Sequence, residues 1–213
     1  MTRKKAEYEN EEFLTNQIIT YIGNKRSLLD FIGEAVELIS KKEKKDKLNI
    51  VDIFSGSGIV ARYLKRYANT LITNDLESYS LTINKCYLSN KSELNMDQLV
   101  SYYNLLQEKL NEKLEPGFIS KLYAPKDSTN IKEGERVFFT TRNAEYIDTC
   151  RKIIEDFPEE VKPYFIAPLL SEVSVKNNTA GVFKGFYKNK KGKGQFGGEG
   201  QNALSRITAD INI

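Results

Sequence analysis

The sequence predicts an α/β protein that begins with a parallel sheet and continues into a mainly helical region. The first observation is an apolar run, Ile50 to Phe54, followed by Ser55-Gly56-Ser57-Gly58 and then by apolar residues at helical spacing. This order indicates a buried strand, a tight glycine turn and a helix. The second observation is another apolar run, which ends at Asp75. In doubly wound folds such a turn and such an acid lie at one edge of the sheet, where a nucleotide-like ligand binds.

The α/β part is expected to comprise residues 1–92. Residues 1–16 are polar and are expected to be loosely ordered. Between 27 and 41 the apolar side chains recur three and four residues apart, which is helical spacing. A lysine-rich connector leads into a strand at about 48–54 and a helix at about 58–68, and the next pair is a strand at about 70–74 and a helix at about 76–90.

The second part, residues 93–213, is expected to be helical and to carry loops. Helices are predicted at about 95–114, 143–156 and 159–174, where apolar residues fall on one helical face. Proline and glycine interrupt the stretch 115–135, which predicts an exposed loop. A glycine-rich basic loop follows the third helix, and the residues from Gln201 to Ile211 are expected to form a helix.

Gly56 and Gly58 fit two interpretations. A tight turn demands positive φ, which glycine adopts freely, and a ligand can approach the backbone closely only where a Cβ is missing. A Gly-x-Gly pair in a loop is more often only a turn. The third glycine of the dinucleotide fingerprint is missing, and an aromatic residue precedes the loop, which disfavours a nicotinamide-dependent enzyme.

Composition excludes several classes of protein. A chain of 213 residues suits one domain with a modest appendage. No apolar run approaches the length of a membrane span and residues 1–12 lack a secretory core, so we expect a soluble, cytoplasmic protein. The chain contains no histidine, and Cys86 and Cys150 lack metal-ligand spacing, which argues against a metal site or a histidine base.

The basic residues are concentrated near the end of the chain. Residues 184–206 carry six basic side chains and one acid, Glu199. A flexible basic loop with interleaved aromatics suits the phosphate backbone of a nucleic acid. A merely solvated loop explains the charges about as well, and the mixed-sign run at 41–47 is interpreted as a solvated connector.

Three segments, taken in order, carry a family resemblance. They are Tyr21-Ile22-Gly23-Asn24-Lys25, Asp52-Ile53-Phe54-Ser55-Gly56-Ser57-Gly58 and Asn74-Asp75. This order resembles the opening of the Dam-like adenine-specific DNA methyltransferases, in which the cofactor motif called X precedes motif I. The resemblance continues in Thr141-Arg142-Asn143-Ala144, Asn178-Thr179-Ala180-Gly181-Val182-Phe183 and Phe196-Gly197-Gly198, so it covers most of the chain.

The resemblance implies a Rossmann-like methyltransferase fold with a target-recognition insertion, S-adenosylmethionine (SAM) as cofactor and double-stranded DNA as substrate. Lys25 would pair with the SAM carboxylate, Asp52 would lie near its methionine part, and Asp75 would accept the ribose hydroxyls. Structural alternatives are a turn and a solvated lysine for Tyr21, Gly23 and Lys25, and an edge position or a cap for the glycine loop for Asp52. Asp75 could also cap the next helix, a role compatible with ribose binding, and we expect both roles together. The implied cofactor-binding set is Tyr21, Gly23, Lys25, Asp52, Phe54, Gly56, Gly58 and Asp75, and the implied DNA-binding set is Asn178, Thr179, Lys184, Lys188, Lys190, Lys191 and Lys193.

The sequence departs from that family at the catalytic motif. In such enzymes Asp/Asn-Pro-Pro-Tyr/Phe holds the amine of a flipped-out adenine, and no two of the five prolines here are adjacent. We therefore expect no catalytic residues in this chain, which would be truncated or split, with a second chain as one source of the missing motif. The strand expected at 48–54 would then have an open edge. The alternative is a non-catalytic SAM- and DNA-binding subunit or a remnant of such an enzyme.

Overall fold

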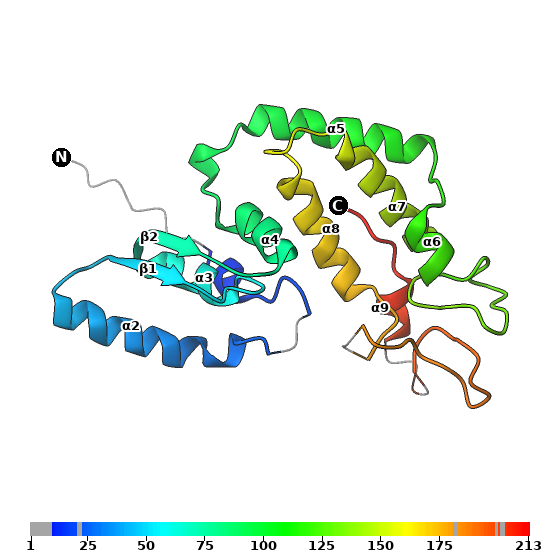
Figure 1. The fold of residues 1–213 in the computed structure, drawn as a ribbon, viewed down its shortest axis with the longest axis horizontal. Helices are drawn as coiled ribbons and strands as arrows, with labels where there is room; N and C mark the ends of the chain where they lie inside the picture. The colour runs from blue at the N-terminus through cyan, green and yellow to red at the C-terminus, as the bar shows by residue number, and fades with distance from the viewer. Residues whose placement is uncertain (1–9, 21–22, 181–182, 199, 201–202) are drawn as a thin grey trace. The chain divides into compact units, whose positions relative to one another are not determined.

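The computed structural model describes residues 10–20, 23–180, 183–198, 200 and 203–213. The described residues form two compact units (Figure 1). Unit 1 comprises the described residues of Met1–Ile18 and Gly23–Asn90, and unit 2 those of Ile19–Ile22 and Lys91–Ile213. The combination of many helices with a small parallel sheet agrees with the predicted α/β class.

Unit 1 contains a two-stranded parallel sheet and the helices that connect its strands. Strand β1 pairs with β2 from Leu48 opposite Ala68 to Asp52 opposite Thr73, with one irregularity after Leu48. The crossover between them is helical, as parallel pairing requires. The elements in chain order are α1 (Glu11–Thr15), η1 (Arg26–Leu28), α2 (Leu29–Glu43), β1 (Leu48–Asp52), α3 (Ile59–Leu64), η2 (Lys65–Tyr67), β2 (Ala68–Thr73) and α4 (Ser78–Leu88).

The core of unit 1 lies on one face of this sheet. Leu29 of α2 and Ile59 and Leu64 of α3 are buried together, and Ile50 of β1 packs against them. Side chains alternate across a strand, so Val51 and its register partner Ile72 point to the opposite face, where both are more than half exposed. Among the described residues, β2 is the only strand that pairs with β1.

The prediction that residues 1–16 are loosely ordered is wrong for α1; residues 1–9 lie outside the described part. Arg62 of α3 is buried, and its guanidinium donates to the carbonyl oxygens of Phe13 and Asn16. These bonds satisfy carbonyl groups that the end of a short helix leaves without a partner. An ion pair of 2.9 Å between Arg66 and Glu11 holds the other end of α1.

Unit 2 is a helical assembly around α7 (Figure 1). Its elements are η3 (Lys91–Glu93), α5 (Met96–Glu112), α6 (Phe118–Tyr123), α7 (Thr141–Glu155), α8 (Pro163–Val175) and α9 (Leu204–Thr208). Helices α5, α6 and α8 all contact α7. Leu106, Ile147 and Phe165, one from each of α5, α7 and α8, belong to its buried core.

Helix α6 corrects the prediction of a loop over 115–135. Its first turn is organised by Asp148 of α7, whose carboxylate accepts hydrogen bonds from the backbone N–H groups of Gly117, Ile119 and Ser120 at 2.8–2.9 Å. These donors are the ones that a helix N-terminus leaves unpaired. The cap comes from a residue remote in sequence, so local patterns could not reveal it.

Helix α9 covers only part of the range predicted to be helical, and residues 209–213 belong to no helix or strand. Asn143 of α7 fixes this segment by donating to the carbonyl of Ala209 at 2.9 Å and accepting from the N–H of Ile211 at 3.0 Å. Ile211 is completely buried as a result. In the described part of the chain, no helix has the length and apolarity that crossing a membrane requires.

Candidate cofactor and DNA-binding sites

The first candidate site begins where β1 ends at Asp52. The loop that follows contains Gly56 at φ 49° and Gly58 at φ 73°, and α3 starts directly after it. Both values lie in the left-handed region that favours glycine. A Cβ on Gly58 would also lie 2.3 Å from the Oδ1 atom of Asn84. The fold itself therefore requires Gly58, in addition to any requirement set by a ligand.

Three buried polar side chains, those of Ser55, Ser80 and Asn84, stabilise this loop by hydrogen bonds. The Oγ of Ser55 donates to the Asn74 carbonyl at 3.1 Å and accepts from the Nδ2 of Asn84 at 3.0 Å. Asn84 also donates to Ser80 of the same helix at 3.1 Å. Our sequence analysis missed Ser80 and Asn84, although two polar residues four apart on the inner face of a helix were a usable signal.

Asp75 connects the tip of β2 to the glycine loop. Its Oδ2 accepts the N–H of Gly56 at 2.7 Å and its Oδ1 accepts the N–H of Glu77 at 3.0 Å. The bonds from Glu77 and Gly56 lower the pKa of this carboxyl. Helix α4 begins only at Ser78, with Glu77 at the cap position, so the capping role considered for Asp75 is wrong. An ionised carboxylate has further acceptor sites, which remain for ribose hydroxyls.

Asp52 is half-buried, and its Oδ2 atom is buried and has no hydrogen-bond partner among the described residues. Burial raises the pKa of this carboxyl, while a bond from the Phe54 backbone and the charge of Lys25 lower it. An unpaired buried carboxylate oxygen is costly unless a donor or cation meets it. Lys25 is exposed, and it lies close enough to Asp52 for its positive charge to act on that carboxyl.

The predicted cofactor-binding set contains two aromatic residues, Phe54 and Tyr21, and the structure describes only Phe54. Phe54 is 76% exposed, so it is not a core residue of unit 1. Its ring is free to contact a ligand beside the glycine loop. Tyr21 lies outside the described residues, whereas Gly23, two positions later, has a φ of 80° that fits the predicted turn.

These features fit SAM, whose parts carry an ammonium, a carboxylate and a ribose. The unpaired Oδ2 of Asp52 suits the ammonium, and Lys25 suits the carboxylate. Asp75 stands where a ribose would be held, beside a loop whose glycines leave the backbone open to a ligand. All of these residues belong to unit 1.

The predicted DNA-binding residues of unit 2 fall into two groups. Asn178 is fully buried: its amide donates to the carbonyls of Val137 at 2.6 Å and Gln195 at 2.8 Å, and accepts from the N–H of Gly197 at 3.0 Å. Thr179 is buried too and donates to Asn177. Both side chains hold this region together, so base reading by either would require breaking these bonds.

Four of the five predicted lysines lie on a short antiparallel hairpin, not on the flexible loop we expected. Lys188 pairs with Gly194, and the N–H of Asn189 donates to the carbonyl of Lys193 at 2.8 Å. Gly194 is buried, and a Cβ there would lie 2.4 Å from Val137. All five predicted basic residues are exposed, which are Lys188, Lys190, Lys191 and Lys193 on the hairpin and Lys184 before it.

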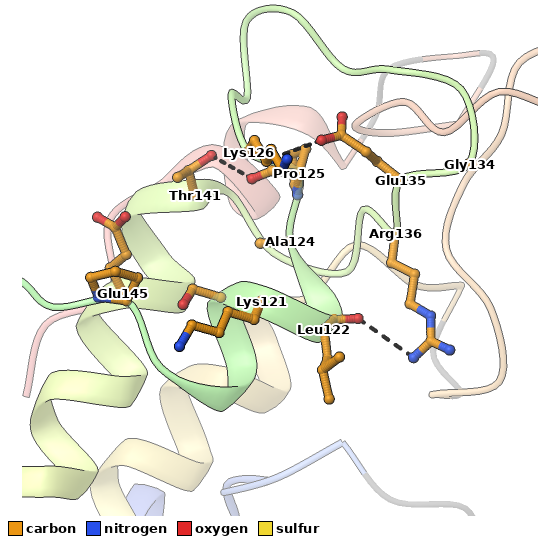
Figure 2. A pocket seen from close by; sticks show the side chains of 12 residues that line it. Lys121, Leu122, Ala124, Pro125, Lys126, Gly134, Glu135, Arg136, Thr141 and Glu145 are labelled. Atoms are coloured by element: carbon orange, nitrogen blue, oxygen red, sulfur yellow. Dashed lines mark hydrogen bonds between the residues drawn. The ribbon is translucent and has the colours of Figure 1, made fainter.

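A pocket of about 540 Å³ lies between α6, the start of α7 and the segment 124–136 (Figure 2). Its polar groups are largely paired within the protein. Glu135 accepts the N–H groups of Lys126 and Lys132, and Thr141 donates to the Pro125 carbonyl at 3.0 Å. None of the residues predicted to bind cofactor or DNA lines this pocket.

Comparison with known proteins supports the resemblance. A family model described as D12 class N6 adenine-specific DNA methyltransferase matches residues 21–203. The chain is 32% identical over 180 residues to Type II methyltransferase M.CviAII of Paramecium bursaria Chlorella virus 1, over 81% of this chain and 50% of that protein. It is 30% identical over 181 residues to Type II methyltransferase M.NlaIII of Neisseria lactamica, with the same two coverages.

A third relative is Modification methylase LlaI of Lactococcus lactis subsp. lactis, 31% identical over 179 residues. That match covers 79% of this chain and 27% of LlaI. The chain therefore spans about half the length, or less, of these relatives. No solved structure matches it.

Proposed function

The chain belongs to the D12 class N6 adenine-specific DNA methyltransferase family, and we propose that it binds SAM through unit 1 and DNA through unit 2. Its relatives are named as Type II methyltransferases and modification methylases, which supports a role in restriction–modification. The parallel β1–α3–β2 unit is consistent with one half of a Rossmann-like sheet. SAM would supply the methyl group, and the exocyclic amine of adenine would receive it.

The observation that carries this proposal is the unpaired, buried Oδ2 of Asp52 beside a glycine loop. In the proposed complex Asp52 accepts the ammonium of the methionine part and Lys25 pairs with its carboxylate. Asp75 accepts the ribose hydroxyls, and Gly56 and Gly58 let the ligand approach the backbone. Gly23 provides the turn before Lys25, and Phe54 lines the site with its exposed ring. Tyr21 is included on the family motif alone.

Binding can be tested by calorimetry on the intact chain. We expect saturable SAM binding and no NADH binding. Asp75→Ala should weaken SAM affinity about tenfold, because charge-assisted hydrogen bonds to the ribose are left unmade. Asp127→Ala is the matched control, since Asp127 also accepts backbone N–H bonds in an exposed turn, in unit 2. Equal SAM affinity in the wild type and Asp75→Ala would contradict the assignment.

A second candidate function is SAM and DNA binding without methyl transfer, and the missing catalytic tetrapeptide favours it. Holding the acceptor amine in line with the methyl group contributes most of this catalysis. We therefore expect the polypeptide of residues 1–213 to transfer no radiolabelled methyl group from SAM to unmethylated DNA. Robust turnover would show that other residues of this chain hold the adenine.

A further inference from the structure

Unit 2 has another pocket, of about 410 Å³, at the base of the lysine hairpin. Its walls are aromatic rings: Phe138, Phe183, Phe186 and, from the end of α6, Tyr123. The rings contact one another, with Phe138 and Phe186 in an edge-to-face arrangement at 5.1 Å. The aromatic walls therefore form one connected cluster.

Phe183 is stacked on one neighbouring ring and is still half exposed. Its ring stacks on Phe138 with centroids 4.5 Å apart and an interplanar angle of 25°. Tyr123 and Phe139 lie about 6 Å away from the same ring. Even so, Phe183 is 51% exposed, whereas Phe138 beneath it is buried. A ring supported on one side and open on the other can stack with one flat partner; insertion between two base pairs needs both faces.

The rest of the pocket lining is positively charged. Arg136, Lys184 and Lys188 contribute to it, and none of the described lining residues is acidic. The Arg136 guanidinium lies 5.6 Å from the Tyr123 ring centroid, and the Lys188 ammonium lies 5.4 Å from that of Phe186. Flat aromatic platforms flanked by cations are the arrangement by which proteins hold single-stranded nucleic acid. The occupant is thus expected to combine a flat ring with nearby negative charge.

We propose that this aromatic–basic pocket binds one unpaired base of a DNA strand. The base stacks on the free face of Phe183, and Arg136, Lys184 and Lys188 contact the neighbouring phosphates. The inference rests on the proposed function, because it takes DNA as the substrate. It adds that unit 2 recognises DNA whose stacking is already interrupted, which extrusion of a base from the duplex produces.

The test compares two short duplexes of the same sequence, one fully paired and one with a single bulged 2-aminopurine. We expect the intact chain to bind the bulged duplex about tenfold tighter, within the range measured for stacking of one base on an aromatic residue. The fluorescence of the bulged base should fall on binding as it stacks on Phe183. Phe183→Ala should abolish both effects, and Phe183→Tyr should retain them.

Tyr103→Ala is the matched control, because Tyr103 is an exposed aromatic residue of α5 outside the pocket lining. It should leave the preference for the bulged duplex unchanged. Salt-dependent binding of both duplexes with equal affinity would overturn this inference and leave the proposed function intact. Absence of binding to either duplex would overturn both. An unchanged preference in Phe183→Ala would show that the base stacks elsewhere.

Discussion

Gly58→Ala separates the requirements of the fold from those of the ligand. A Cβ at this position would lie 2.3 Å from the Oδ1 of Asn84, and φ is 73°. The new methyl group must displace Asn84, which donates hydrogen bonds to Ser55 and Ser80. The substitution should therefore destabilise unit 1 even without SAM.

The size of the effect follows from two contributions. Holding alanine in the left-handed region costs about 1–2 kcal/mol. Losing the two buried hydrogen bonds of Asn84 costs about 1 kcal/mol each. The sum is about 3–4 kcal/mol, a large share of the total stability of a small domain. Gly23→Ala is the matched control, since Gly23 has a φ of 80° and a methyl group added there would meet no atom within 4 Å; it should cost only about 1–2 kcal/mol.

The assay is native-state hydrogen exchange of the β1 and β2 amides without SAM, because it reports the opening free energy of unit 1 separately from unit 2. The double variant Gly58→Ala/Asn84→Ala should be about 2 kcal/mol less destabilised than the sum of the single variants, because the clash and the lost bonds share one cause. If Gly58→Ala costs no more than Gly23→Ala, the proposed contact with Asn84 does not constrain the loop.

Four further predictions concern charge and burial. Burial raises the pKa of Asp52 in the folded state above the ordinary aspartate value of 3.8. The free energy of unfolding should therefore fall as the pH rises from 3.8 towards that raised pKa. Urea titrations of Asp52→Asn should no longer show this fall. SAM affinity should weaken as the pH drops through the same window, because the ammonium group of SAM pairs with the ionised form of Asp52. Replacing Lys188, Lys190, Lys191 and Lys193 by Gln should flatten the salt dependence of DNA binding by roughly 0.9 per lost phosphate contact, whereas the same change at Lys41, Lys42, Lys44 and Lys45 should not. Burial raises the pKa of both Cys86 and Cys150 to about 12, so neither thiol should react with iodoacetamide at neutral pH until urea unfolds the chain.

The strand, glycine turn and helix around Gly56, and the acid at the tip of β2, could be predicted because each depends on neighbours in sequence. What the sequence analysis missed depends on distant partners. Helix α6 takes its cap from Asp148 in α7, and α1 is held by Arg62 in α3. Asn178 was predicted to contact DNA because its residue type and motif suit base reading, but the fold uses both of its amide N–H donors and one acceptor position internally.

The hydrogen bonds made by Asn178 also divide the hairpin region into a tip whose sequence can vary and a base whose geometry is fixed. They attach the strand that leaves the hairpin, at Gln195 and Gly197, to the backbone at Val137, directly beside Phe138. The tip between Asn189 and Lys193 makes its own turn, closed by the side chain and backbone of Asn189. During divergence the tip can therefore gain, lose or exchange residues while the aromatic pocket at its base keeps its geometry.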